Sequence, residues 1–282
     1  MKKIKKVYIV KYFSVFLIAL NLTLTSCEDV IDLDLRNAEP RIVIEAVVTN
    51  TTQPKTVKIT KTGDFYEPAN YETVSNAFVK IEDGDGYSEV LTEVQPGVYY
   101  SESLGGDVNK TYSITVAAED KEYRAESHMN EPALIDSLTL EKDTRPARGG
   151  GEVQYILHVH FTDNPDKKDY ARIIPNVGGV KIPGFIVYDD RLTNGNEIDF
   201  RIFITDKYQV KIGTKIRVEM LTLDEPTYLY FKTLNKASAA NSGANQRGGS
   251  VAPANPESNW DNDALGYFGA YSVVADSIVV EE

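Results

Sequence analysis

The amino-acid sequence predicts an all-β protein made of two successive blocks. We expect an immunoglobulin-like or prealbumin-like β-sandwich over residues 41–130, the first block, and a β-rich C-terminal domain with one helix over residues 131–282, the second block. Val57 and Ile59 alternate with polar residues, as in a half-buried strand. Turn residues recur in the first block about every 8–12 positions, which is typical of a sandwich.

The strands of both blocks are predicted from β-branched and aromatic runs bounded by glycine, proline, asparagine and aspartate. In the first block the expected strands are 42–48, 55–60, 78–81, 87–94, 98–100, 112–116 and 123–125. The pair Glu131-Pro132 marks the expected boundary. In the second block the expected strands are 134–140, 153–161, 170–174, 180–188, 198–204 and 215–223, with one or two more over 267–280.

One helix is predicted near residues 225–239. Asp224 is placed to cap its N-terminus, and Pro226 suits its first turn. Tyr228, Phe231 and Leu234 fall on one face, so we expect the helix to pack on a sheet. Residues 240–258 are rich in small and polar residues, which predicts a flexible loop.

The N-terminus predicts export. A lysine-rich start precedes residues 12–26, which carry no charge and are too few for a membrane-spanning helix of roughly 20 residues. Residues 1–26 therefore fit a signal peptide. The sequence Leu24-Thr25-Ser26-Cys27 resembles a bacterial lipobox, which implies that Cys27 becomes the first residue and carries acyl chains such as palmitate.

Residues 27–40 are expected to form an acidic tether behind the lipidated cysteine, with a first edge strand over 28–35 as the alternative. The segment from Glu28 to Leu35 resembles the surface-export signals of Bacteroidota lipoproteins, which implies exposure at the cell surface. Without the five lysines of the first 27 residues, 25 basic residues face 42 acidic ones, a net charge of −17. This balance argues against nucleic acid as a partner, because phosphates require a basic surface.

Cys27 is the only cysteine, so the folded part has neither disulfides nor a thiolate metal site. The sequence Asp83-Gly84-Asp85-Gly86 has some likeness to a calcium loop, but an EF-hand needs a glutamate at its twelfth position, where Val94 stands. Aspartate and glycine between two alternating runs instead predict a hairpin turn.

His158 and His160 are weak candidates for metal ligands. Two positions apart in a strand, they share one face and have the donor atoms for a metal. A third ligand would come from elsewhere, with Asp163 and His128 as candidates. Ordinary half-buried histidines are the alternative, and the prediction for the whole chain is no metal and no cofactor.

The chain is predicted not to be an enzyme, since it lacks a Gly-x-Ser-x-Gly motif, a reactive cysteine after acylation and a phosphate-binding glycine loop. Aromatic residues in polar stretches are the remaining signal. Phe65, Tyr66, Tyr71 and Trp260 are candidate contacts for a ligand or partner. Alternatively, these rings fold back and plug the ends of the sandwich.

Four motifs in order suggest a family: Thr62-Gly63-Asp64-Phe65-Tyr66, Leu91 to Tyr99, Phe161-Thr162-Asp163-Asn164-Pro165 and Leu265 to Ser272. With the lipobox they resemble the Bacteroidota outer-membrane lipoproteins grouped as domain-of-unknown-function family 4249. The resemblance implies a lipid-anchored outer-membrane protein, often encoded beside a TonB-dependent barrel transporter, and it brings no catalytic residues.

The leading hypothesis is therefore a lipoprotein that binds a ligand or docks on a TonB-dependent barrel during nutrient uptake. A surface adhesin or structural lipoprotein without a transport role is the alternative. A third hypothesis, a metal-assisted hydrolase, would depend on zinc bound by His158 and His160.

Overall fold

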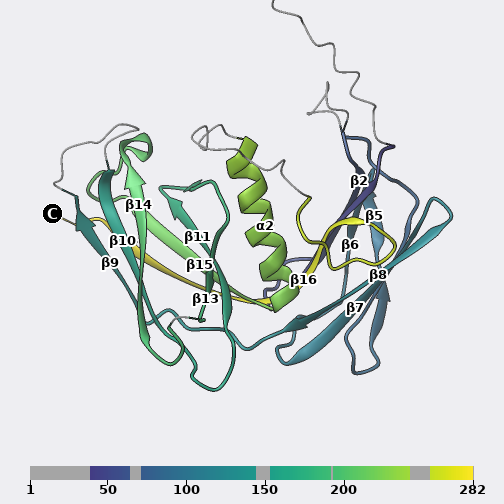
Figure 1. The fold of residues 1–282 in the computed structure, drawn as a ribbon, viewed down its shortest axis with the longest axis horizontal. Coiled ribbons are helices and arrows are strands. Elements are labelled where there is room, and N and C mark those ends of the chain that lie inside the picture. The colour runs from purple at the N-terminus through teal and green to yellow at the C-terminus, as the bar shows by residue number, and fades with distance from the viewer. Residues whose placement is uncertain (1–38, 64–70, 144–152, 192, 242–254, 282) are drawn as a thin grey trace, which may run out of the picture. The chain divides into compact units, whose positions relative to one another are not determined.

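Strands dominate the folded chain, as the alternating sequence predicts (Figure 1). The structure, a computed structural model, describes residues 39–63, 71–143, 153–191, 193–241 and 255–281. These residues form several β-sheets and one α-helix, α2 (Glu225–Asn241). The mostly-β class is thus confirmed. No helix among the described residues is long and apolar enough to cross a membrane.

Sixteen strands follow one another along the described residues. They are β1 (Ile42–Thr49), β2 (Thr56–Lys61), β3 (Phe78–Glu82), β4 (Ser88–Val90), β5 (Thr92–Gln95), β6 (Val98–Tyr100), β7 (Lys110–Ala118), β8 (Lys121–Met129), β9 (Ser137–Lys142), β10 (Val153–Thr162), β11 (Tyr170–Val177), β12 (Val180–Lys181), β13 (Ile186–Asp189), β14 (Glu197–Thr205), β15 (Lys215–Leu223) and β16 (Leu265–Val279). A short 3-10 helix, η1 (Asp206–Tyr208), precedes β15.

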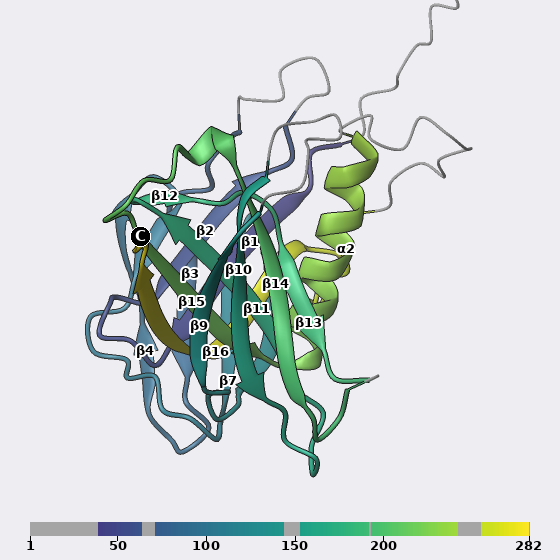
Figure 2. The ribbon, with the colours of Figure 1, turned by 90° about the vertical axis from the view of Figure 1, so that its left-hand side faces the viewer.

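Three sheets organise these strands. A nine-stranded sheet has the order β12-β11-β15-β16-β1-β2-β6-β5, with β13 paired to β11. A four-stranded sheet has the order β4-β3-β7-β8. A three-stranded sheet has the order β14-β10-β9, and Figure 2 shows these three strands side by side.

The long strand β16 joins strands of both blocks. Its first half pairs in parallel with β1, from Val43 opposite Leu265 to Thr49 opposite Tyr271. From Ser272 onward it pairs instead with β15, in antiparallel register. The expected boundary at Glu131-Pro132 stays a prediction, but hydrogen bonding along β16 links the two blocks directly.

The first core lies between the four-stranded sheet and the part of the nine-stranded sheet that contains β1, β2 and β6. Along β7 the side chains of Tyr112, Ile114 and Val116 are buried, whereas the residues between them are half-buried. Ile44, Ile59 and other apolar residues face them in one cluster. The period of two read from the sequence is what places these side chains inside.

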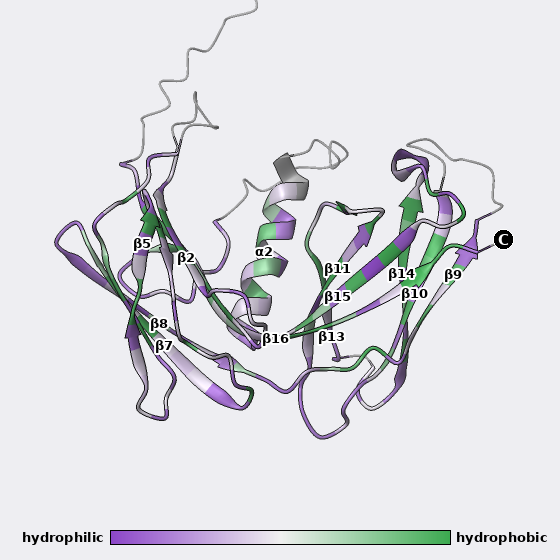
Figure 3. Ribbon diagram, turned by 180° about the vertical axis from the view of Figure 1, so that it is seen from behind, coloured by the Kyte–Doolittle hydropathy of each residue, from purple (hydrophilic) through white to green (hydrophobic). Residues whose placement is uncertain are grey.

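A second core lies between the three-stranded sheet and strands β11, β15 and β16. Leu157 and Val159 of β10 meet Ile216, Val218 and other residues of β15 in this cluster. Figure 3 shows hydrophobic and hydrophilic residues alternating along β15. The alternate positions of β10 face away from this core and can therefore be polar, as His158 and His160 are.

Two expected strands prove to be interrupted. The strand expected over 87–94 is split, because the chain crosses from the four-stranded sheet (β4) to the nine-stranded sheet (β5) at the buried Leu91. The N–H of Leu91 donates to the carbonyl of Val79 at 2.9 Å and fixes this crossing. The strand expected over 180–188 is split into β12 and β13 around Pro183-Gly184, where proline lacks an N–H and Gly184 has a φ of +111°.

Candidate functional site

Helix α2 begins where the sequence places its cap. The N–H of Thr227 donates to Asp224 Oδ1 at 3.0 Å, which satisfies one free donor of the first turn. The other carboxylate oxygen, Oδ2, accepts the hydroxyl of Ser127 at 2.7 Å and the N–H of His128 at 3.1 Å. Asp224 thus attaches the start of α2 to β8 of the first block.

An aromatic cluster lies where α2 packs on the nine-stranded sheet. Tyr228, Phe231 and Leu234 of the helix contact this cluster, as their spacing predicts. The ring of Tyr230 stacks on Tyr267 at 4.6 Å between centroids, and Phe231 meets Tyr267 edge-on at 5.0 Å. Burial raises the pKa of Tyr267 well above its usual value, so this phenol stays neutral.

Arg172 of β11 lies inside this aromatic cluster and is only 9% exposed. Its guanidinium carbon is 4.1 Å from the ring centre of Phe231 and 5.1 Å from that of Phe185. Its Nε has no hydrogen-bond partner among the described residues, and burial lowers its pKa. Aromatic ring faces therefore surround this cation. The only sequence signal was a charge within the apolar run from Tyr170 to Ile174.

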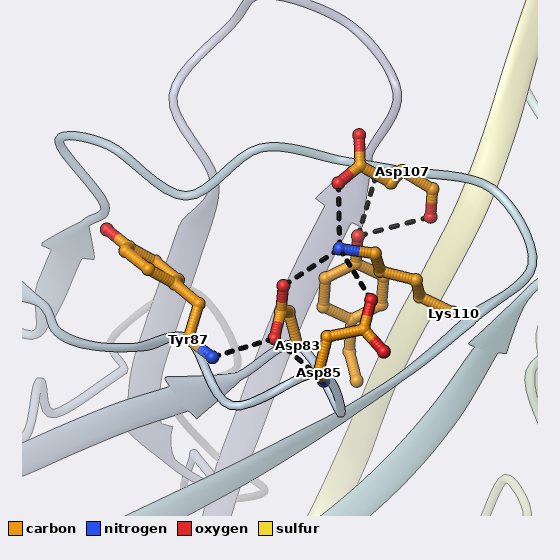
Figure 4. A network of polar contacts seen from close by, with 6 residues as sticks. Asp83, Asp85, Tyr87, Asp107 and Lys110 are labelled. Carbon is orange, nitrogen blue, oxygen red and sulfur yellow. Dashed lines mark hydrogen bonds and ion pairs between the residues drawn. The ribbon is translucent and has the colours of Figure 1, made fainter.

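The loop at Asp83 is a hairpin between β3 and β4, as predicted. Asp83 Oδ1 accepts the N–H groups of Asp85 and Tyr87, each at 3.0 Å. The ammonium of Lys110 lies 2.9 Å from Asp83, 3.1 Å from Asp85 and 3.0 Å from Asp107 (Figure 4). These three carboxylates raise the pKa of Lys110, so a lysine occupies the position that a bound cation would take.

The predicted pair His158 and His160 is joined by Asp199. All three residues offer ligand atoms that lie within 4.8 Å of one another. His158 Nδ1 is 2.7 Å from Asp199 Oδ1, and the two imidazole rings stack with centroids 5.9 Å apart. Among the described residues the structure groups Asp199, and neither Asp163 nor His128, with the two histidines.

Asp163 and His128 have other partners. Asp163 Oδ2 accepts the N–H of Gly195 at 2.8 Å, and burial raises the pKa of this carboxyl. His128 Nδ1 is 3.0 Å from the hydroxyl of Thr111. Asp199 was missed because only the register of β10 with β14, which places His160 opposite Asp199, brings it to the histidines. The sequence shows no more than its alternation with Ile198 and Phe200.

The predicted contact aromatics divide into two groups. Tyr71 is 57% exposed, whereas Trp260 is 7% exposed and its indole N–H donates to the carbonyl of Ile44 at 3.0 Å. The interpretation as an internal plug fits Trp260, while a contact role for Tyr71 stays a prediction. Phe65 and Tyr66 lie outside the described residues, as do Cys27, the tether up to residue 38 and residues 242–254 of the expected loop.

A family model described as a domain of unknown function, DUF4249, matches residues 28–277. The match covers nearly the whole chain after Cys27 and includes all three sheets. A search of curated proteins found no match.

Proposed function

The chain belongs to the DUF4249 family, and from this we propose that it is an outer-membrane lipoprotein, anchored through Cys27, that binds a ligand or docks on a TonB-dependent barrel during nutrient uptake. One observation carries the proposal. The family match begins at residue 28, directly after the cysteine of the lipobox-like sequence. The expected processing point and the start of the family domain therefore coincide.

The charge of the chain supports an acyl anchor. A body with 25 basic and 42 acidic residues after Cys27 is repelled by anionic lipid. A single acyl chain binds membranes only marginally, so stable attachment requires more than one. The acidic residues behind Cys27 support the further proposal that the domain faces outward.

The first block is proposed to be an immunoglobulin-like or prealbumin-like sandwich. The support is that one apolar core, which includes Ile44, Ile59 and Ile114, is enclosed between two sheets. Loops at the ends of such a scaffold commonly carry binding residues. Among the described residues, we assign a contact with a ligand or partner to Tyr71, whose ring is exposed. No reaction is assigned to the chain.

Co-purification tests this proposal. The full chain, tagged after its last residue, is recovered from outer membranes in mild detergent, and its partners are identified by mass spectrometry. A TonB-dependent barrel is expected with the wild type and in smaller amount with Tyr71→Ser. Leu134→Ser is the matched control, because Leu134 is also a large exposed side chain, 65% exposed, but belongs to the second block.

Recovery without a barrel under mild conditions would contradict a transport role. Loss of surface attachment on gene deletion, with nutrient uptake unchanged, would favour the adhesin alternative.

A further inference from the structure

We propose that the outward face of the three-stranded sheet binds one divalent transition-metal ion of the zinc class through His158, His160 and Asp199. The proposal concerns a site separate from Tyr71 and does not depend on the membrane anchor.

The sheet register brings the three side chains to one face. His158 and His160 are alternate residues of β10, whose intervening residue Val159 is fully buried in the second core. Asp199 of β14 is directly opposite His160. Side chains of alternate residues, and of residues directly opposite on the next strand, share a face of the sheet. The ligand set therefore depends on two paired strands, β10 and β14, and not on a loop.

The distances suit closure around one ion. The ligand atoms lie within 4.8 Å of one another, and zinc bonds of about 2.0–2.2 Å in tetrahedral geometry need separations of roughly 3.4 Å. Side-chain rotation can supply the difference. The side chain of Asp199 is 35% exposed, so it can rotate toward the histidines without displacing core residues.

Metal binding would replace a proton. His158 Nδ1 and Asp199 Oδ1 now share a hydrogen bond of 2.7 Å. A metal bound between these atoms takes the electron pair of His158 Nδ1, and the proton that Nδ1 gives up is regained at Nε2 by exchange with solvent, so the ring stays neutral. No electron is transferred and no other reactant is needed.

Neighbouring side chains already orient the ligands. Thr139 Oγ1 lies 3.0 Å from His160 Nε2. Thr139 therefore contacts this ring nitrogen and not the other one, Nδ1. Arg201 Nε donates to Asp199 Oδ2 at 3.0 Å and leaves Oδ1 directed at His158. Hydrogen bonds of this kind fix the rings and carboxylates that bind metals in proteins.

Open space and negative charge adjoin the group. A hollow of about 560 Å³ is lined by Asp136, Ser137, His160, Phe161, Glu197, Ile198 and Asp199. Glu141 Oε2 is 3.5 Å from His158 Nε2 on the other side. Water can thus complete the coordination sphere. Two imidazoles and one carboxylate without thiolate suit zinc and its neighbours in the first transition series.

Zinc titration of the full chain tests the proposal. The protein is purified in detergent, stripped with a chelator and titrated with Zn²⁺ by calorimetry. We expect one saturable site per chain, and at least tenfold weaker binding in His158→Ala, His160→Ala and Asp199→Asn. His128→Ala is the matched control and should bind as the wild type, because the third histidine of the chain bonds Thr111 elsewhere.

A second measurement covers variants that fold poorly. Zn²⁺ should raise the unfolding midpoint of the wild type and of His128→Ala but not that of Asp199→Asn, whose exposed side chain can be changed with little effect on folding. No saturable Zn²⁺ binding by the wild type, or equal loss in His128→Ala, would overturn the proposal. Neither result bears on the proposed function, which the co-purification with a barrel tests separately.

Discussion

The hydroxyl of Ser127 donates a 2.7 Å hydrogen bond to Asp224, 97 residues further along the chain. The same hydroxyl oxygen accepts the N–H of Ala270 at 2.8 Å. Ser127 belongs to β8, Asp224 caps α2 and Ala270 belongs to β16. One buried serine and one buried carboxylate therefore hold three distant segments together, including the strand that joins the two blocks.

Asp224→Ala should lower the free energy of unfolding by about 2–4 kcal/mol. A lost helix cap costs about 1 kcal/mol, and buried donors left without an acceptor cost about 1–3 kcal/mol. Urea unfolding followed by circular dichroism measures the change. Asp206→Ala is the control, since Asp206 is exposed in the first turn of η1 and should matter little. Equal losses in the two variants would contradict the linking role of Asp224.

Gly266→Ala should destabilise the protein far more than Gly179→Ala. The two glycines have nearly the same φ, +91° and +90°, so the conformational strain is shared. A Cβ at Gly266 would lie 2.1 Å from the carbonyl oxygen of Ile44, whereas one at Gly179 meets nothing within 4 Å. We expect about 1–2 kcal/mol for Gly179→Ala and at least about 3 kcal/mol for Gly266→Ala.

The comparison of the two glycine variants measures the close approach of β16 to β1. Thermal unfolding of both proteins in the same buffer is sufficient. A similar midpoint for the two variants would mean that the strands are further apart than the structure places them.

Trp260 should behave as a buried plug. It is the only tryptophan, so native fluorescence should be blue-shifted and should move to longer wavelength on unfolding. Trp260→Phe removes the donor to Ile44 O and should cost about 1–2 kcal/mol, while Trp260→Ala should cost about 3–5 kcal/mol. Tyr71→Ala, at an exposed ring, should change stability by about 0.5 kcal/mol at most. Solvent-exposed emission from native protein would refute the plug.

Asp189 should make stability depend on pH in the acid range. Arg191 donates to both carboxylate oxygens, at 2.7 and 2.8 Å, and lowers the pKa of Asp189 to about 2. An unfolded aspartate titrates near pH 3.9, so the ionised pair stabilises the native state above about pH 4. This contribution is lost as the pH falls from about 4 through 2.

The expected size is about 1 kcal/mol, because Arg191 is 63% exposed and solvent screens the pair. Urea unfolding between pH 5 and pH 2 should show a shallower loss in Asp189→Asn, which lacks the titrating group. Parallel pH profiles for the variant and the wild type would show that the pair does not contribute.

Much of the local structure could be predicted from the sequence, because it depends on neighbours along the chain. The alternation in β7 and the Asp224 cap of α2 are examples. The crossing at Leu91 could not be predicted, since an apolar residue in an alternating run does not show which of two sheets its backbone joins. The change of partner along β16 at Ser272 depends on register in the same way.

Only part of the candidate metal group could be predicted, again because strand register is not visible in the sequence. The spacing of His158 and His160 fixes a shared face, whereas Asp199 is reached only across the β10–β14 register. For Arg172 the residue could be identified in the sequence, but its surroundings could not. Its charge is visible in the sequence, but the rings of Phe185 and Phe231 that surround it come from two distant segments.

The most direct test of the proposed function is mass spectrometry of the N-terminal peptide of protein extracted from outer membranes. We expect the mature chain to begin at Cys27 and to carry acyl chains, with residues 1–26 removed. An unmodified Cys27, or a mature protein that retains residues before it, would contradict the account.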